Sequence, residues 1–297
     1  MNNRNFGHFE HPRVAFREFG DYSKRHEFYK LQMKESRPVT YILGARCKNG
    51  VVLIGDRKAV TLSGEQRDFT SKIKCLQFPE YAQIVFAGAG ASFVFDEFLK
   101  EMPRRVAKSM ALFKEENKKH PQFHLDYSHY DFRTDCMRLL QEMKKRYSGL
   151  SKKYGSLLVM CIVQKEAISK KFYNQNWTLY CADLIDCKLV PQDRKVELSY
   201  YPHHADIFLT SWSRKESTIR DTARLGSFII KYIEKEKLAD KTIGVGKQQP
   251  QIWFFEDNKD EPREIIGSEL KKLLKGVDDE VEKKRREIGS LSKFLRL

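Results

Sequence analysis

Two side chains that could take part in chemistry are predicted to lie at the same end of one β-hairpin. Thr40 opens one apolar run, and Asp56 closes the next. An Asn49-Gly50 turn between such runs is a strong hairpin signal, because both residues tolerate the positive φ of a tight turn. A threonine hydroxyl attacks a carbonyl group only when a base removes its proton. This polar end is therefore either a reaction site or a polar rim above a core.

Further strands and helices must position these residues. Apolar content and turn spacing suggest that the hairpin continues as an antiparallel meander. Helices are expected where apolar residues begin to recur about every 3.6 residues along the chain. We expect strands at 40–47, 51–56, 73–78, 82–87, 156–164, 177–184, 187–191, 205–211 and 251–257. We expect helices from 93 to 102 resuming beyond Pro103 as far as 112, at 132–147, at 215–237, and from 263 to the end.

The order of these elements predicts an α+β fold. A four-layer α/β/β/α sandwich, in which helices flank two antiparallel sheets, buries every amphipathic face in this order. We divide the chain into an N-terminal extension or propeptide (1–39), a main domain (40–260) and a charged C-terminal helical extension (261–297).

The composition favours a basic protein without a membrane span. The 297 residues carry 55 Lys+Arg against 40 Asp+Glu, a net charge of +15. Such a surplus raises non-specific affinity for nucleic acid, but no interleaving of aromatic and basic residues indicates a base-stacking surface. The longest apolar run is broken by Gly88 and Gly90 and is shorter than the roughly 20 residues of a bilayer crossing. We therefore expect no membrane association, and nucleic acid binding is not supported by a motif.

Cysteines and histidines indicate neither a disulfide framework nor a metal site. The six cysteines form no CxxC pair, which favours free buried thiols in a reducing compartment. The N-terminal residues lack the apolar centre of a signal peptide, so we expect a cytoplasmic location. His120, His124, Asp126 and His129 cluster, but their spacing fits no zinc pattern. We expect no metal and no organic cofactor.

The segments "TYILGARCKNGVVLIGDRKAV", "SKIKCLQF" and "IVFAGAGAS" together resemble the start of a proteasome β-type subunit of the Ntn (N-terminal nucleophile) hydrolase superfamily. Asp56 lies 16 residues after Thr40, and Lys72 lies 32 residues after it, which are the spacings of that family. The resemblance covers about residues 40–257 and implies the Ntn-hydrolase form of the four-layer fold.

The resemblance also implies the roles of four residues. Thr40 would be the nucleophile, with its own freed α-amine, of reference pKa about 8, as the base. Lys72 would stabilise the alkoxide, and Asp56 would hold the Lys72 ammonium group. Gly88 matches the glycine whose backbone N–H contributes to the oxyanion hole.

The second half is similar to the family through two further positions. Asp240, near a glycine-rich turn, corresponds to an auxiliary carboxylate, and Ser211 corresponds to a site serine. The implied substrates are peptides or proteins. The implied assembly partners are copies of the same chain or other proteasome-type subunits.

Two functions remain open. The family places glycine before the threonine, whereas this chain has Val39, and Thr40 acquires an α-amine only if the Val39–Thr40 bond is cut. The first is a threonine-type peptidase or amidase that becomes active when residues 1–39 are removed. The alternative is a non-catalytic structural or assembly subunit that keeps Asp56 and Lys72 as an ion pair. The C-terminal helix could dock on a partner, but a capping helix with a solvated face explains its pattern better.

Overall fold

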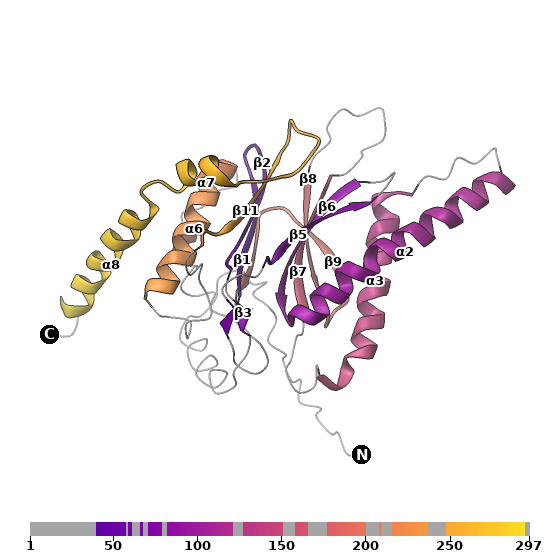
Figure 1. Cartoon of the computed structure of the whole chain (residues 1–297), viewed down its shortest axis with the longest axis horizontal. Coiled ribbons are helices and arrows are strands. Elements are labelled where there is room, and N and C mark those ends of the chain that lie inside the picture. The colour runs from indigo at the N-terminus through magenta and orange to yellow at the C-terminus, as the bar shows by residue number, and fades with distance from the viewer. Residues whose placement is uncertain are drawn as a thin grey trace, which may run out of the picture. The chain divides into compact units, whose positions relative to one another are not determined.

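The computed structural model of the chain describes residues 40–57, 59–60, 66–67, 71–78, 82–120, 127–150, 158–165, 177–199, 208–209, 216–236 and 248–294. This part of the protein is α+β, as predicted. It contains two five-stranded antiparallel sheets, a two-stranded ribbon and several helices (Figure 1).

The first sheet has the strand order β10-β1-β2-β11-β12. Its strands are β1 (Tyr41–Cys47), β2 (Gly50–Gly55), β10 (Lys195–Ser199), β11 (Gln251–Glu256) and β12 (Arg263–Glu264). The predicted hairpin is confirmed, because β1 and β2 pair from Cys47 opposite Gly50 to Ile42 opposite Gly55. Gly50 has a φ of 150°, and a Cβ there would lie 2.2 Å from the carbonyl oxygen of Phe255. Only glycine fits at this position of the turn.

The second sheet has the strand order β5-β6-β7-β8-β9. Its strands are β5 (Ile73–Phe78), β6 (Ala82–Gly90), β7 (Leu158–Lys165), β8 (Trp177–Asp183) and β9 (Leu189–Gln192). The short strands β3 (Ala59–Val60) and β4 (Gln66–Arg67) pair with each other. The predicted single meander is wrong, because the chain leaves the first sheet after β2 and enters the second at β5.

Side chains that alternate along β1 contact a helix on one face of the first sheet and the second sheet on the other face. On β1, Tyr41, Leu43 and Ala45 join the apolar cluster that includes α6 (Ile219–Lys235). Gly44 faces the other way, where a Cβ would meet Leu179 of the second sheet at 3.1 Å. Successive residues of a strand point to opposite faces, so one strand serves both contacts.

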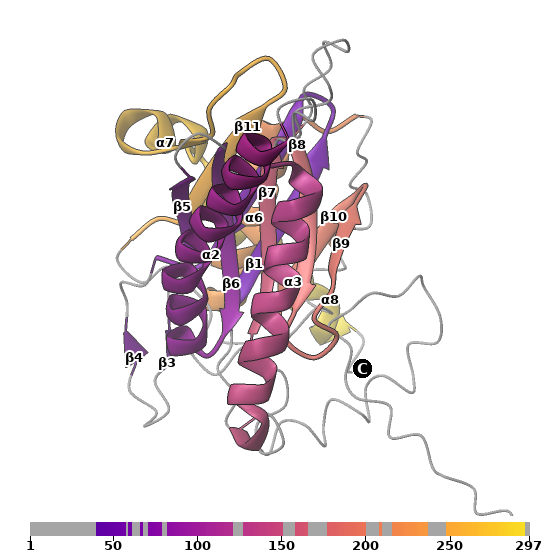
Figure 2. The ribbon, with the colours of Figure 1, turned by 90° about the vertical axis from the view of Figure 1, so that its right-hand side faces the viewer.

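Helices cover the outward faces of both sheets (Figures 1 and 2). On the second sheet, α2 (Ser92–Lys119) contacts β5 and β6, and α3 (His129–Arg146) contacts α2 and β9. On the first sheet, α6 contacts β1, β2 and β11. Two further helices, α7 (Gly267–Leu273) and α8 (Val277–Phe294), follow β12.

Several helix and strand predictions need correction. Helix α2 runs through Pro103 and extends to Lys119, because a buried stripe that includes Phe98, Met102 and Val106 packs on both sides of the proline. The predicted helix from 263 is instead β12, α7 and α8, with the chain turning at Gly276 (φ 82°). Strand β10 was not predicted. Of the strand expected at 205–211, only 208–209 are described, and they are helical.

Two sequence expectations about composition can be compared with the structure. None of the helices among the described residues is long and apolar enough to span a membrane.

All six cysteines are described, and all are free thiols; five are buried and Cys75 is half-buried. Burial raises the pKa of Cys181 to about 12, so this thiol is unreactive at neutral pH.

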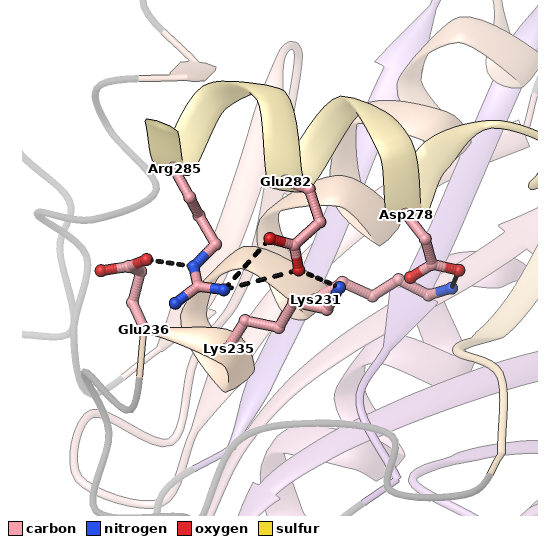
Figure 3. Close-up of polar contacts among 6 residues, drawn as sticks. All are labelled: Lys231, Lys235, Glu236, Asp278, Glu282 and Arg285. Atoms are coloured by element: carbon pink, nitrogen blue, oxygen red, sulfur yellow. Dashed lines mark hydrogen bonds and ion pairs between the residues drawn. The ribbon is translucent and has the colours of Figure 1, made fainter. Parts of the chain in front are cut away.

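Helix α8 is attached to α6 by apolar contacts and by a row of ion pairs (Figure 3). Val277 and Val281 of α8 are fully buried. Lys231 and Lys235 of α6 reach carboxylates of α8, whereas Arg285 of α8 bonds to Glu236 at the end of α6. The Lys231 Nζ lies 2.9 Å from Asp278 Oδ2, and the Lys235 Nζ lies 2.6 Å from Glu282 Oε1. The docking of α8 therefore depends partly on charge.

Asp278→Asn is expected to destabilise the protein by roughly 0.5–1 kcal/mol, because the Lys231 ammonium group loses a charged partner that is itself 60% exposed to solvent. The Lys231 side chain is only 7% exposed. Asp279→Asn is the matched control, since Asp279 is exposed and makes no ion pair within the described residues. Urea unfolding of the two variants measures the difference. Equal stability of the two variants would contradict a role of the Lys231–Asp278 pair.

Candidate active site

Three polar side chains converge from the ends of three strands. Thr40 immediately precedes β1, and Asp56 immediately follows β2. Because β1 and β2 are antiparallel neighbours, these two residues lie at the same end of the first sheet. Lys72 immediately precedes β5, the edge strand of the second sheet. The cluster therefore joins the two sheets.

The Lys72 ammonium group lies between the other two side chains. Its Nζ is 2.6 Å from Asp56 Oδ1 and 3.1 Å from Thr40 Oγ1. Thr40 is 8% exposed, Lys72 is 5% exposed and Asp56 is fully buried. An ion pair excluded from water is well ordered and strongly coupled, unlike a pair on the surface. The structure thus brings together the hydroxyl, ammonium and carboxylate groups that were selected from the sequence.

The backbone of the hairpin holds Asp56 in place. The Asp56 N–H donates to the Tyr41 carbonyl oxygen (3.0 Å), and the Tyr41 N–H donates to Asp56 Oδ1 (3.0 Å). The same carboxylate oxygen accepts from Lys72. Tyr41 directly follows Thr40, so these bonds also fix the position of Thr40 relative to the carboxylate.

The pKa of Lys72 is lowered from its ordinary value, chiefly because burial disfavours the charged amine. The charge of Asp56 and its hydrogen bond oppose this shift. The amine is therefore easier to deprotonate than an exposed lysine. When protonated it can donate to Thr40 Oγ1 and stabilise negative charge there.

Gly88 lies beside the cluster, but its N–H has another partner. It donates to the carbonyl oxygen of Lys72 (3.0 Å), one position beyond the pairing of β5 and β6, which begins with Ile73 opposite Ala87. While this bond is present, the N–H cannot be directed at an oxyanion. The oxyanion role of Gly88 stays a prediction and requires the bond to open or to be shared.

Packing explains why residue 88 is glycine. A Cβ at this position would lie 2.5 Å from the ring of Phe95, whose side chain is packed in the core of α2 and the second sheet. The glycine allows the ring to cover β6 directly opposite Lys72. Its contribution to the site in the described structure is to anchor the Lys72 carbonyl.

Gly88→Ala is expected to destabilise the protein by about 1–3 kcal/mol, because the ring of Phe95 must shift. Gly149→Ala is the control, since nothing lies within 4 Å of a Cβ built there. Thermal unfolding of both variants measures the effect. A Gly88→Ala protein as stable as the control would show that Phe95 moves without cost.

Several predicted site residues lie outside the described residues. These are Ser211, Asp240, and Val39 with the rest of segment 1–39. His124 and Asp126 of the histidine cluster also lie outside them, whereas His120 is the C-cap residue that follows α2 and His129 begins α3.

One polar residue next to the site was missed by sequence reasoning. Gln251 is 3% exposed and bonds to Ile73, the residue after Lys72. The signal that could have found it is a glutamine directly before the apolar run 252–255 of this strand.

Comparisons with known proteins show what this fold is similar to. No protein-family model and no curated protein sequence matches the chain. Solved structures of Anbu proteins do match it. The Gly-1 mutant of Anbu from Hyphomicrobium sp. strain MC1 has a TM-score of 0.59 and 11% identity, and the match covers 82% of this chain and 96% of that one. Anbu from Yersinia bercovieri, an ancestral β-subunit, has a TM-score of 0.56 and 10% identity, with 86% and 97% covered. The Anbu complex from Pseudomonas aeruginosa has a TM-score of 0.57 and 11% identity, with 86% and 96% covered.

The fold resembles that of Anbu. The predicted resemblance to proteasome β-type subunits is thereby corrected, because the matching structures are Anbu proteins, a proteasome-like but different family. At 10–11% identity the similarity to Anbu concerns the fold alone. The chemistry of this chain must therefore be argued from its own residues.

Proposed function

We propose that the chain is a threonine-type hydrolase of amide bonds, acting on peptides or proteins, with Thr40 as the nucleophile after removal of residues 1–39. The observation that carries this proposal is the buried contact of Lys72 Nζ with both Thr40 Oγ1 (3.1 Å) and Asp56 Oδ1 (2.6 Å). A structural ion pair needs the second contact only. The first directs positive charge at a hydroxyl group that could attack a carbonyl.

The proposed reaction begins with the α-amine that cleavage of Val39–Thr40 would create. This amine, with a reference pKa of about 8, takes the proton of the Thr40 hydroxyl. The Thr40 oxygen then attacks the substrate carbonyl, while the Lys72 ammonium group stabilises the negative charge. Collapse of the tetrahedral intermediate breaks its C–N bond: the protonated α-amine gives its proton to the leaving nitrogen, the amine product departs, and an ester remains on Thr40. Water hydrolyses this ester and restores the hydroxyl group.

The remaining predictions belong to the same proposal. The helices on both outward faces support the four-layer α/β/β/α arrangement of Ntn hydrolases. Gly88, Ser211 and Asp240 stay candidates for the oxyanion and auxiliary roles. The division of the chain at residues 39 and 260 and a cytoplasmic location also stay predictions. We further propose self-assembly, because the Pseudomonas aeruginosa Anbu that shares the fold forms a helical assembly.

A non-catalytic subunit is the second candidate. It is favoured by one observation, which is that the Gly88 N–H is already bonded to Lys72, so the predicted oxyanion donor is occupied. In this reading the three buried groups tie the two sheets together, and the chain acts as an assembly module.

The N-terminus of the protein from its native cells separates the two functions. Intact mass spectrometry is expected to show a chain that begins at Thr40 and gains the mass of a threonine-directed electrophile on that residue. A chain that keeps residues 1–39 in all fractions and is not labelled would refute the hydrolase and leave the assembly module.

A further inference from the structure

Gln251 lies between the two strand ends that carry Asp56 and Lys72. It begins β11, where it pairs with Gly55 of β2, the residue before Asp56. Its side chain is almost completely buried and leaves the first sheet to reach the second. A single residue is therefore attached to both halves of the candidate site.

The amide group of Gln251 binds the backbone of Ile73 as a neighbouring strand would. Its Oε1 accepts from the Ile73 N–H (3.0 Å), and its Nε2 donates to the Ile73 carbonyl oxygen (2.9 Å). The Nε2 also lies 3.0 Å from Ser71 Oγ. The residues on both sides of Lys72 are thus bonded to this side chain.

The strand pairing explains why such a partner is needed. Lys72 and Gly88 form a hydrogen-bonded pair, so Ile73 and Ala87 form the next, non-hydrogen-bonded pair. The N–H and carbonyl groups of Ile73 therefore point away from β6. Buried backbone groups need partners, and among the described strands β5 is at the edge of its sheet, with β6 as its one neighbour.

We infer that Gln251 is a positioning residue for Lys72. Gly88 holds the Lys72 carbonyl from one side, and Gln251 holds Ser71 and Ile73 from the other. Since Gln251 is itself paired next to Asp56, it sets the distance at which the Lys72 amine meets Asp56 and Thr40. The consequence for catalysis rests on the proposed hydrolase function, whereas the effect on Lys72 does not.

Glutamine suits this task because its side chain offers one acceptor and two donors in one plane. Methionine has a similar length but offers no comparable donor or acceptor. Asparagine keeps the amide but is one methylene shorter, so it cannot reach Ile73 from the same backbone position. These two substitutions test the chemistry of the contact and its length separately.

The experiment compares Gln251→Met and Gln251→Asn with Thr222→Val in the full chain. Thr222 is also buried, and its Oγ1 accepts from Cys47 Sγ (3.2 Å) on the helix-covered face of the first sheet. NMR of chains labelled at the lysine side chains, with the Lys72 signal assigned by Lys72→Met, gives the titration midpoint of the amine. Peptide hydrolysis by the same variants in chains that begin at Thr40, where the proposed α-amine is present, gives kcat and KM.

Both Gln251 variants are expected to move the Lys72 signal and its titration midpoint, and to lower kcat roughly tenfold with little change in KM. Thr222→Val should leave the Lys72 signal, its titration midpoint and kcat unchanged, even if it lowers stability. A folded Gln251 variant with the wild-type Lys72 signal overturns the inference; if the methionine variant does not fold, the asparagine variant decides. If the wild-type chain that begins at Thr40 has no hydrolytic activity, the proposed function is refuted, and the NMR result still decides the role of Gln251.

Discussion

Thr40→Ala is expected to lower kcat/KM for peptide hydrolysis by roughly 10⁴-fold or more, because it removes the hydroxyl group that forms the ester intermediate. The comparison uses wild-type and variant chains that both begin at residue 40, so that removal of the preceding segment does not depend on Thr40. Binding of the peptide should be nearly unchanged, since the hydroxyl acts mainly in the transition state.

Thr40→Ser is the matched control, because it keeps the hydroxyl group and the N-terminal amine. It should retain most of the activity and remain a target of the threonine-directed electrophile. If Thr40→Ala hydrolysed peptides as fast as the wild type, the nucleophile would be another residue.

Asp56→Asn is expected to have the largest effect on stability, a loss of about 3–5 kcal/mol. The substitution removes the charge that compensates a buried ammonium group, and the uncompensated charge is costly. The Lys72 and Asp56 side chains are 5% and 0% exposed, so solvent screening does not relieve this cost. Urea unfolding at neutral pH measures the change in the free energy of unfolding.

A double variant shows whether the pair itself is responsible. Asp56→Asn combined with Lys72→Met removes both charges and should be markedly more stable than Asp56→Asn alone, since no isolated charge remains. Activity should be lost in both variants. A double variant whose destabilisation equals the sum of the two single ones would show that the residues do not interact.

The pH dependence of stability has a defined sign. Because burial lowers the pKa of Lys72, the unfolded chain holds this proton more tightly than the folded chain. The contribution of Lys72 to stability therefore increases as the pH rises from its folded pKa towards the ordinary value of 10.5. Loss of the Asp56 charge lowers the folded-state pKa of Lys72 further. The pH range over which Lys72 makes stability rise should then extend to lower pH. The Lys72→Met variant should lack this contribution.

Local signals in the sequence determined the elements that need no distant partner. The Asn49-Gly50 turn specifies the hairpin, which places Thr40 and Asp56 together whatever surrounds them. The start of α3 is also encoded locally, because Ser128 and Asp131 form a capping box. The sequence prediction placed this start at residue 132 because it relied on the spacing of apolar residues and did not use the capping box.

Other elements depended on contacts between distant parts of the chain. Strand β10 alternates polar residues with the buried Val196 and Leu198 over only five residues, a pattern too short to identify a strand, and its conformation is held by pairing with the buried β1. Helix α2 continues through Pro103 because its buried face packs on the second sheet across that point. Propensity and spacing cannot predict such outcomes, since the stabilising partner is not nearby in sequence.

The candidate site also depends partly on local sequence signals and partly on contacts between distant residues. The sequence alone selected Thr40, Asp56 and Lys72, and it placed the first two at one end of a hairpin. Only the tertiary structure brought Lys72 from the second sheet to within 2.6 Å of Asp56, and only it placed the Gly88 N–H on the Lys72 carbonyl and the Gln251 amide on the backbone of Ile73. The physical reason is that hairpin pairing is a short-range property of the chain, whereas the position of one sheet against the other is set by side chains and hydrogen bonds that join residues far apart in sequence.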